Sequence, residues 1–266
     1  MIRAEKLTVA RGGRHVVCDL DLSVVSGDFL VVAGPNGAGK TSLLRTLSGE
    51  LAAAAGRVFL DGRPVRDYAQ TELARRRAFL AQQTECRLPF TCEEIVMLGA
   101  EAAGLRGAIA HQMVGESMTL AGVEGFARRV ISQLSGGEQQ RVHWARTLAQ
   151  IGPDPAGRLV FLDEPVSSLD LEHQHALLRT AAGLAHRGAA VVSVLHDLNL
   201  TAAYAGRVLL LNESRVVAEG TPAEVFTPER IGRVFNVRAS VVPQPPDGRP
   251  LVIVDPQRSG TGGVSG

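Results

Sequence analysis

The residues with the clearest chemical potential form a glycine-rich stretch near the N-terminus. The sequence from Gly34 to Thr41 fits the phosphate-binding pattern G-x-x-x-x-G-K-[ST]. Glycines let a backbone wrap closely around a phosphate with its N–H groups pointing inward. Lys40 is then placed to reach the β- and γ-phosphates, and the Thr41 hydroxyl to bind Mg²⁺. The candidate nucleotide-binding residues of this stretch are Gly34, Pro35, Asn36, Gly37, Ala38, Gly39, Lys40, Thr41 and Ser42.

The elements on either side of this stretch are those that such a loop needs. Residues 29–33 are an apolar run typical of a buried strand, and residues 42–47 are expected to form a helix. The N-terminal end of a helix carries partial positive charge and favours an anion. A glycine turn could precede a helix without any ligand. All four fixed positions of the pattern are filled, however, and a strand stands in front of them, so we interpret the stretch as a phosphate site.

A second group of chemical residues ends another apolar run. Residues 159–162 read as a buried strand, and Asp163 and Glu164 follow at once. In a protein with a phosphate-binding loop, Asp163 is expected to hold Mg²⁺, directly or through water. Glu164 is expected to act as general base toward the attacking water. An ordinary strand end capped by acids is the alternative, which the phosphate-binding loop upstream disfavours.

The stretch L-S-G-G-E-Q-Q-R at residues 134–141 is the most informative part of the chain about its class of protein. Ser135, Gly136 and Gly137 open a helix expected to run to Ala149. The start of a helix offers free N–H groups and a positive dipole, to which Ser135 adds a hydroxyl. We therefore interpret it as a second anion site.

Together, the phosphate-binding loop, the Asp163-Glu164 strand end and the 134–141 stretch resemble the ATP-binding subunit of an ABC transporter. The resemblance extends from about residue 2 to residue 240. It implies an α/β fold of the P-loop NTPase class: an ABC ATPase core with an N-terminal antiparallel β-subdomain and a helical subdomain inserted at about 83–150. Residues 241–258 are then a C-terminal extension. The Gly/Ser/Thr-rich tail 259–266 is expected to be disordered.

The resemblance also implies how the site is completed. Two copies close head to tail around two ATP molecules, each lying between the phosphate-binding loop of one copy and the residues Ser135, Gly136, Gly137 and Glu138 of the other. Asp170 matches the loop that meets the partner copy. Gln82 matches a glutamine that senses Mg²⁺ and links core to subdomain, with Gln83 as the alternative. His196 matches a histidine that contacts the γ-phosphate.

The position of His196 in the sequence supports the same role. It follows the apolar run 190–195, at the carboxyl edge of a sheet, where ligands bind in open α/β folds. A histidine at a strand end is more often structural, but here it stands in a nucleotide-binding context. His173 and His175 lie two residues apart on an expected helix and do not share a face. We interpret them as surface or packing residues rather than metal ligands.

One departure from the family pattern concerns adenine. An aromatic residue usually stands 29 residues before the phosphate-loop lysine, and here that position is Arg11. A guanidinium can stack on a base, with roughly 0.5–2 kcal/mol by analogy with cation–π contacts. Arg11 is therefore a candidate base contact, and we predict weak selectivity for adenine.

Composition limits the other classes of function. The net charge of +1 gives no general electrostatic case for nucleic acid, and 4% aromatic residues make a base-stacking surface unfavourable. The three cysteines contain no C-x-x-C pair, which favours a reducing cytosol over a zinc site. No run of 18 apolar residues occurs, and the first residues lack a signal-peptide core, so we expect no membrane span.

The remaining pattern divides into strands and helices. We expect strands at 2–9, 16–24, 57–60, 78–80, 207–211 and 215–218, with turns at 11–14, 61–62 and 212–213. We expect helices at 71–77, 107–120 and 171–187, one from a Thr91–Glu94 capping box to Leu98, and two small ones before Val237.

Further stretches resemble one subgroup of the family. Residues 88–96 are similar to importers of iron chelates, haem and cobalamin, while 140–146, 170–175 and 194–200 resemble bacterial haem-importer ATPases. This implies a peripheral ATPase at the cytoplasmic face of the inner membrane, working with two permease subunits and, through them, a periplasmic binding protein. Residues 82–90 would form the groove for a short permease helix. Siderophore or cobalamin import is the first alternative. A soluble ABC ATPase or a regulator that does not hydrolyse ATP is a remote one.

Overall fold

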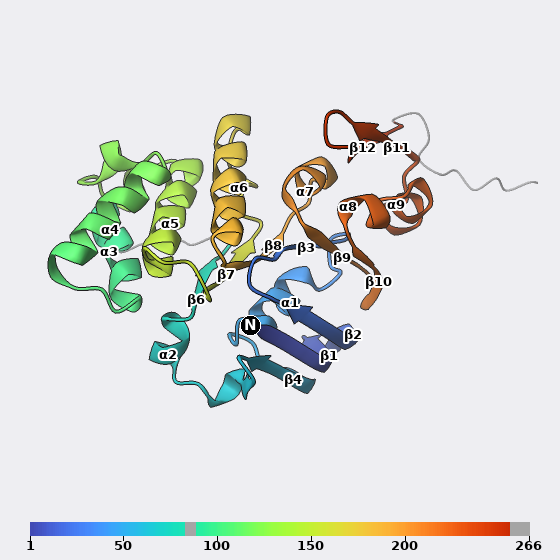
Figure 1. Cartoon of the computed structure of the whole chain (residues 1–266), viewed down its shortest axis with the longest axis horizontal. Coiled ribbons are helices and arrows are strands. Elements are labelled where there is room, and N and C mark those ends of the chain that lie inside the picture. The colour runs from blue at the N-terminus through green and yellow to red at the C-terminus, as the bar shows by residue number, and fades with distance from the viewer. Residues whose placement is uncertain (83–88, 256–266) are drawn as a thin grey trace, which may run out of the picture.

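A six-stranded sheet forms the centre of the molecule. The computed structural model of the chain describes residues 1–82 and 89–255, and the strand order is β10-β9-β3-β8-β7-β6 (Figure 1). Strands β6 to β9 and β3 run parallel, and β10 pairs with β9 antiparallel. The strands are β3 Phe29–Ala33, β6 Arg77–Leu80, β7 Leu159–Asp163, β8 Ala190–Val194, β9 Arg207–Asn212 and β10 Arg215–Gly220.

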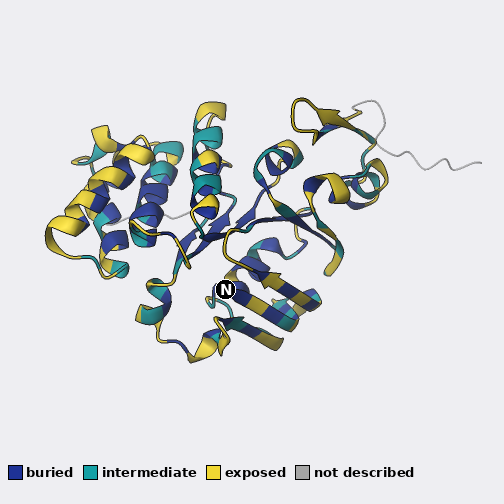
Figure 2. Cartoon of the chain, in the orientation of Figure 1, coloured by how far each residue is buried: buried dark blue, intermediate teal, exposed yellow. Residues whose placement is uncertain are grey.

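Successive residues of the central strands enter two different apolar clusters, one on each face of the sheet. In β3, Phe29, Val31 and Ala33 belong to one cluster, and Leu30 and Val32 to the other. Every residue of β3, β7 and β8 is buried (Figure 2). Burial on both faces explains why these strands read as continuous apolar runs rather than as alternating ones.

A second, antiparallel sheet lies against one face. Its order is β2-β1-β4-β5, with β1 Ile2–Arg11, β2 Arg14–Val24, β4 Ala55–Leu60 and β5 Arg63–Pro64. The short helix η1 Val65–Asp67 follows β5. Apolar residues of β1 and β2 join the same cluster as Leu43, Leu44 and Leu47 of α1 Lys40–Leu47. Helix α1 is therefore packed between the two sheets, with the phosphate-binding loop at its N-terminal end.

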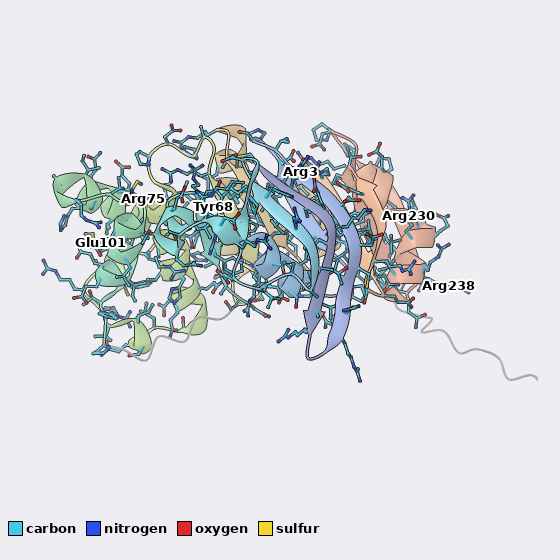
Figure 3. The ribbon with its side chains drawn as sticks, turned by 90° about the horizontal axis from the view of Figure 1, so that it is seen from below. Arg3, Tyr68, Arg75, Glu101, Arg230 and Arg238 are labelled. Carbon is cyan, nitrogen blue, oxygen red and sulfur yellow. The ribbon has the colours of Figure 1, made fainter. Side chains whose placement is uncertain are left out.

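Three helices lie together at one end of the molecule, on the left of Figure 1, where they are drawn in green. They are α3 Cys92–Ala102, α4 Gly107–Leu120 and α5 Gly136–Ile151, with the turns η2 Glu124–Phe126 and η3 Ile131–Gln133 between the last two. The capping box between Thr91 and Glu94 is present. Seen from below, Glu101 of α3 lies at this end, near Arg75, and Arg230 lies at the opposite end (Figure 3). The division into core and helical subdomain stays a prediction.

The C-terminal part contains two elements that the sequence pattern did not indicate, a helix after β8 and a C-terminal hairpin. The expected helix α6 Leu171–His186 leads to β8, and the unexpected helix α7 Leu198–Tyr204 follows β8. After α8 Pro222–Val225 and α9 Pro228–Phe235, strands β11 Ala239–Gln244 and β12 Arg249–Val254 form a hairpin. The Asn199 amide donates to the Val252 carbonyl at 3.1 Å and accepts from its N–H at 2.8 Å, so the hairpin is fixed to α7. Hairpin β11–β12 begins before the extension expected at 241–258. The tail 259–266 and Gln83 lie outside the described residues.

Several expected bounds differ from those observed: the turn at 11–14 narrows to 12–13, and the helix expected to end at Leu98 runs to Ala102. The helix expected at 71–77 is shorter, α2 Gln70–Ala74, because Arg77 pairs with Leu159 in the central sheet. The turn expected at 212–213 lies one residue later, at Glu213 and Ser214, whose φ angles of 47° and 63° form the bend. No helix within the described ranges is long and apolar enough to cross a bilayer.

Candidate functional site

The phosphate-binding loop folds around the ammonium group of its own lysine. Lys40 is 5% exposed, and its Nζ donates to the carbonyls of Gly34 and Pro35, both at 2.8 Å. Burial lowers the pKa of Lys40, while the negative charges of Glu164 and Asp163 act in the opposite direction. These contacts hold a positive charge at the N-terminal end of α1, where the backbone N–H groups are free.

Two glycines of the loop are required by sterics. Gly34 has φ +146°, and a Cβ there would lie 2.2 Å from the Leu211 carbonyl oxygen. Gly39 caps α1 with φ +91°, and a Cβ there would lie 2.5 Å from the Val16 carbonyl oxygen. Strands β9 and β2 therefore press on the loop from two sides, and only glycine fits at these positions.

The residues expected to hold Mg²⁺ lie together. The Thr41 hydroxyl donates to Oδ1 of Asp163 at 2.8 Å. Asp163 is fully buried, and its Oδ2 has no hydrogen-bond partner within the described part of the chain. Burial raises the pKa of Asp163, partly offset by the Thr41 hydrogen bond. A buried, unpartnered carboxylate oxygen beside a hydroxyl is the donor set that a hard cation prefers, so these residues fit Mg²⁺.

Glu164 lies between the two residues that the family resemblance pointed to. Its Oε1 accepts from His196 Nε2 at 2.5 Å, and its Oε2 accepts from Gln82 Nε2 at 2.6 Å. Gln82 lies two residues beyond the end of β6, and His196 two residues beyond the end of β8. Glu164 itself follows β7 with a left-handed φ of +50°, and its N–H donates to the Val194 carbonyl at 3.2 Å.

The sheet order explains this convergence. Strands β3, β8, β7 and β6 are neighbours in that order and run parallel, so their carboxyl ends meet at one edge. Val32, Val194 and Asp163 lie level with one another across three strands. The loop after each strand supplies a part of the site, as expected for an open α/β sheet.

A cavity of about 190 Å³ opens between these parts. Glu164 and His196 line it together with Arg11 and Val16. The phosphate-binding loop and the start of α1 supply the rest of the lining, through Asn36, Gly37, Gly39, Lys40, Thr41 and Ser42. Arg11 lies at the exposed end of β1. Val16 was missed in the sequence because an isolated valine in a strand carries no chemical signal.

The second anion site lies elsewhere. Ser135 Oγ accepts from the Glu138 N–H at 3.4 Å, and Glu138 accepts from the Ser135 N–H at 2.7 Å, so a complete capping box opens α5. The Ser135 hydroxyl and N–H lower the pKa of Glu138. Neither these two residues nor Gly136 and Gly137 line the cavity at the phosphate-binding loop. Ser135 is exposed, and a Cβ on Gly137 would lie 2.8 Å from the carbonyl oxygen of Ser168.

Asp170 is the N-cap of α6, and the structure gives it a partner that the sequence did not reveal. Its Oδ1 accepts from the His173 backbone N–H at 3.0 Å and from His173 Nδ1 at 2.6 Å. His173 was interpreted as a surface or packing residue. The signal that could have found it is the spacing of three residues from an Asp at a helix start.

Comparisons with known proteins identify this arrangement. The family model for ABC transporters matches residues 17–167. The hemin import ATP-binding protein HmuV of Pseudomonas fluorescens is 44% identical over 95% of this chain and 99% of its own length. HmuV of Rhodopseudomonas palustris is also 44% identical, over 90% of each chain. A dimeric ATP-binding cassette solved in a post-hydrolysis state with ADP and Pi matches with a TM-score of 0.73 and 27% identity, over 84% of this chain and 99% of that one. The chain belongs to the ABC transporter family, as one of its ATP-binding cassettes.

Proposed function

We propose that this chain is the ATP-hydrolysing subunit of a bacterial importer that carries haem (hemin) across the inner membrane. The observation that carries the hydrolytic part is the position of Glu164, held by His196 and Gln82 at the wall of the phosphate-loop cavity. The names of the HmuV relatives support haem as the transported molecule. No residue of this site binds haem, which would contact the permease and the binding protein.

Each residue of the site has a task in hydrolysis. Lys40 and the loop N–H groups bind the phosphates of ATP. Glu164 takes a proton from the attacking water, while His196 and Gln82 fix the direction of its carboxylate. Mg²⁺, when held by Thr41 and Asp163, neutralises negative charge on the phosphates. Arg11, which lines the cavity, is placed to contact the base.

The position of residues 135–138, the start of α5, supports a homodimer. Ser135, Gly136, Gly137 and Glu138 do not line the cavity of their own chain, so they are free to complete the ATP site of a second copy. The dimeric cassette matched above is similar in fold. Asp170 would meet the partner copy at the same interface.

The proposed setting is the cytoplasmic face of the inner membrane. There the dimer would bind two permease subunits and act, through them, on a periplasmic substrate-binding protein, without nucleic acid. The permease groove was placed at residues 82–90, most of which lie outside the described residues. Siderophore or cobalamin import is the alternative for the same motor.

The test is ATPase activity of the chain reassembled in liposomes with the permease and binding protein encoded beside it. The binding protein is loaded with haem, with a ferric siderophore or with cobalamin, and the E164Q variant is the control. Stimulation by haem alone supports the proposal. Stimulation by another ligand rejects haem and keeps the motor. Equal hydrolysis by wild type and E164Q rejects Glu164 as the base, and hydrolysis that no loaded binding protein stimulates rejects the coupling to import.

A further inference from the structure

The segment 165–170, which leads from the proposed base to α6, is held from both sides by side chains of helices. On one side, Gln140 of α5 donates to the Pro165 carbonyl at 3.4 Å. On the other, Gln174 of α6 donates to the Leu169 carbonyl at 2.8 Å. The segment is thus fixed through its backbone rather than by packing alone.

His173 extends this fixation to a charged pair. Its Nδ1 lies 2.6 Å from Oδ1 of Asp170, and its Nε2 lies 2.9 Å from Nη1 of Arg141. A carboxylate only accepts hydrogen bonds and a guanidinium only donates them. His173 is therefore neutral with its proton on Nδ1, and it bridges the two ions. Its backbone and side-chain hydrogen bonds lower the pKa of Asp170.

Arg141 is itself anchored in the helical end of the molecule. Its Nη1 also donates to the Gly122 carbonyl at 2.9 Å, just after α4. Its guanidinium carbon lies 5.8 Å from the centre of the Phe126 ring. The Asp170–His173–Arg141 bridge thus joins the segment that follows Glu164 to the helix that begins at Ser135.

We propose that His173 is a positioning residue for ATP hydrolysis, which keeps segment 165–170 in register with α5. The inference rests on the proposed function. It assumes that hydrolysis depends on the positions of Glu164, just before the segment, and of Asp170 at its end, so that losing the bridge disturbs both residues. His173 does not line the cavity and need not touch the nucleotide. Its effect is expected on turnover, not on ATP binding.

The same helix supplies a matched control. His175, two residues further along α6, points to a different neighbour: its Nδ1 lies 2.7 Å from the hydroxyl of Tyr204 in α7. It contacts neither Asp170 nor Arg141 among the described residues. H175N therefore removes one histidine side-chain hydrogen bond, to Tyr204, and leaves the Asp170–His173–Arg141 bridge intact.

The decisive substitution is H173N. Asparagine can donate to Asp170 from a position near Nδ1, but it has no atom that reaches Arg141 in place of Nε2. We expect kcat for ATP to fall about tenfold, as for a lost hydrogen bond to a charged group, with KM within about twofold of wild type. H175N should keep both constants. In a background that already carries R141A, H173N should cause no further loss of kcat, because the two residues act as one contact.

A second measurement does not depend on turnover. Amide hydrogen exchange of residues 166–170 in the full chain should speed up in H173N and stay unchanged in H175N. Unchanged exchange in H173N overturns the proposal, whatever the ATPase rate. So does an H173N variant with wild-type kcat, or a loss that adds to that of R141A. The E164Q control separates this from the proposed function: a chain whose hydrolysis survives E164Q refutes the base, while the exchange result still decides the bridge.

Discussion

Nε2 of His196 lies 2.5 Å from Oε1 of Glu164, although the two residues leave different strands of the central sheet. The carboxylate is therefore oriented by a neighbouring strand end rather than by its own loop alone. The backbone of Glu164 has a left-handed φ of +50°, a conformation that non-glycine residues rarely adopt. This relationship makes Glu164 the residue whose chemical change should matter most.

The first prediction concerns E164Q. Glutamine keeps the size and an accepting oxygen but cannot take a proton, so kcat for ATP should fall at least ~100-fold. Binding of ATP should persist, since Lys40 and the loop are untouched, and ATP-bound pairs of copies should accumulate in size-exclusion chromatography. A variant that keeps more than a tenth of the wild-type rate would show that Glu164 is not the base.

The second prediction uses the burial of Asp163. Burial raises the pKa of Asp163 above its ordinary value of 3.8, so the folded chain holds this proton more tightly than the unfolded chain. The associated stability is complete below about pH 3.8 and is lost as pH rises through the raised folded pKa. At pH 7 the ionised side chain therefore destabilises the fold.

We accordingly expect D163N to melt at a higher temperature than wild type at pH 7, with a smaller difference at pH 4.5. The same substitution should abolish the further stabilisation that Mg²⁺ with ATP gives to the wild type. Differential scanning fluorimetry measures both effects. If the gain in melting temperature of D163N over wild type is smaller at pH 7 than at pH 4.5, the buried charge of Asp163 does not destabilise the fold.

The third prediction separates the structural and functional parts of Ser135. Ser135 and Thr221 each open a helix with a complete capping box, to Glu138 and Glu224 respectively. Replacement by alanine should lower the free energy of unfolding by about 1 kcal/mol in either case. Only S135A should also lower ATP turnover, because Ser135 alone would complete a partner's ATP site. Equal turnover of S135A and T221A, measured beside urea unfolding, would remove Ser135 from the site.

The fourth prediction concerns the choice of base. Arg11 lines the cavity, whereas Arg14, its partner in the β1–β2 register, does not. A guanidinium stacks on any base, so competition between ATP and GTP should show less than tenfold preference. R11A should weaken both nucleotides alike, with R14A as the control. A preference for ATP of a hundredfold or more would show that another group reads adenine.

The sequence predicted the central part of the fold well for a physical reason. Strand β3 has the expected bounds because a run of five apolar residues between Asp28 and Gly34 is typical of a short buried strand. Helix α7 was missed because its seven residues are too few to show a helical period. Hairpin β11–β12 was missed because its strands are half exposed, and Asn199, which fixes it, is distant in the chain.

The site divides in the same way. The phosphate-binding loop is one continuous stretch of sequence, and so is the strand that ends at Asp163 and Glu164. Residue types and spacing were therefore enough to predict both. The contacts of Glu164 with Gln82 and His196 join segments far apart in the chain, and only the family resemblance pointed to them. The His173 bridge had a sequence signal only on its Asp170 side, where an Asp stands three residues earlier at a helix start. Its contact with Arg141 depends on how α5 packs beside α6.

The four neighbouring strands that converge on the site also set the order in which it can form. The phosphate-binding loop leaves the ribosome early, but the strand ends that deliver Glu164 and His196 are made much later, after the helical segment has emerged. Parallel pairs between such distant strands form slowly, because a long loop must close first. During synthesis, Lys40, Asp163 and Glu164 are therefore present before all of their final neighbours are in place. The nascent chain is most exposed to misfolding and proteolysis in the interval before β8 inserts between β3 and β7.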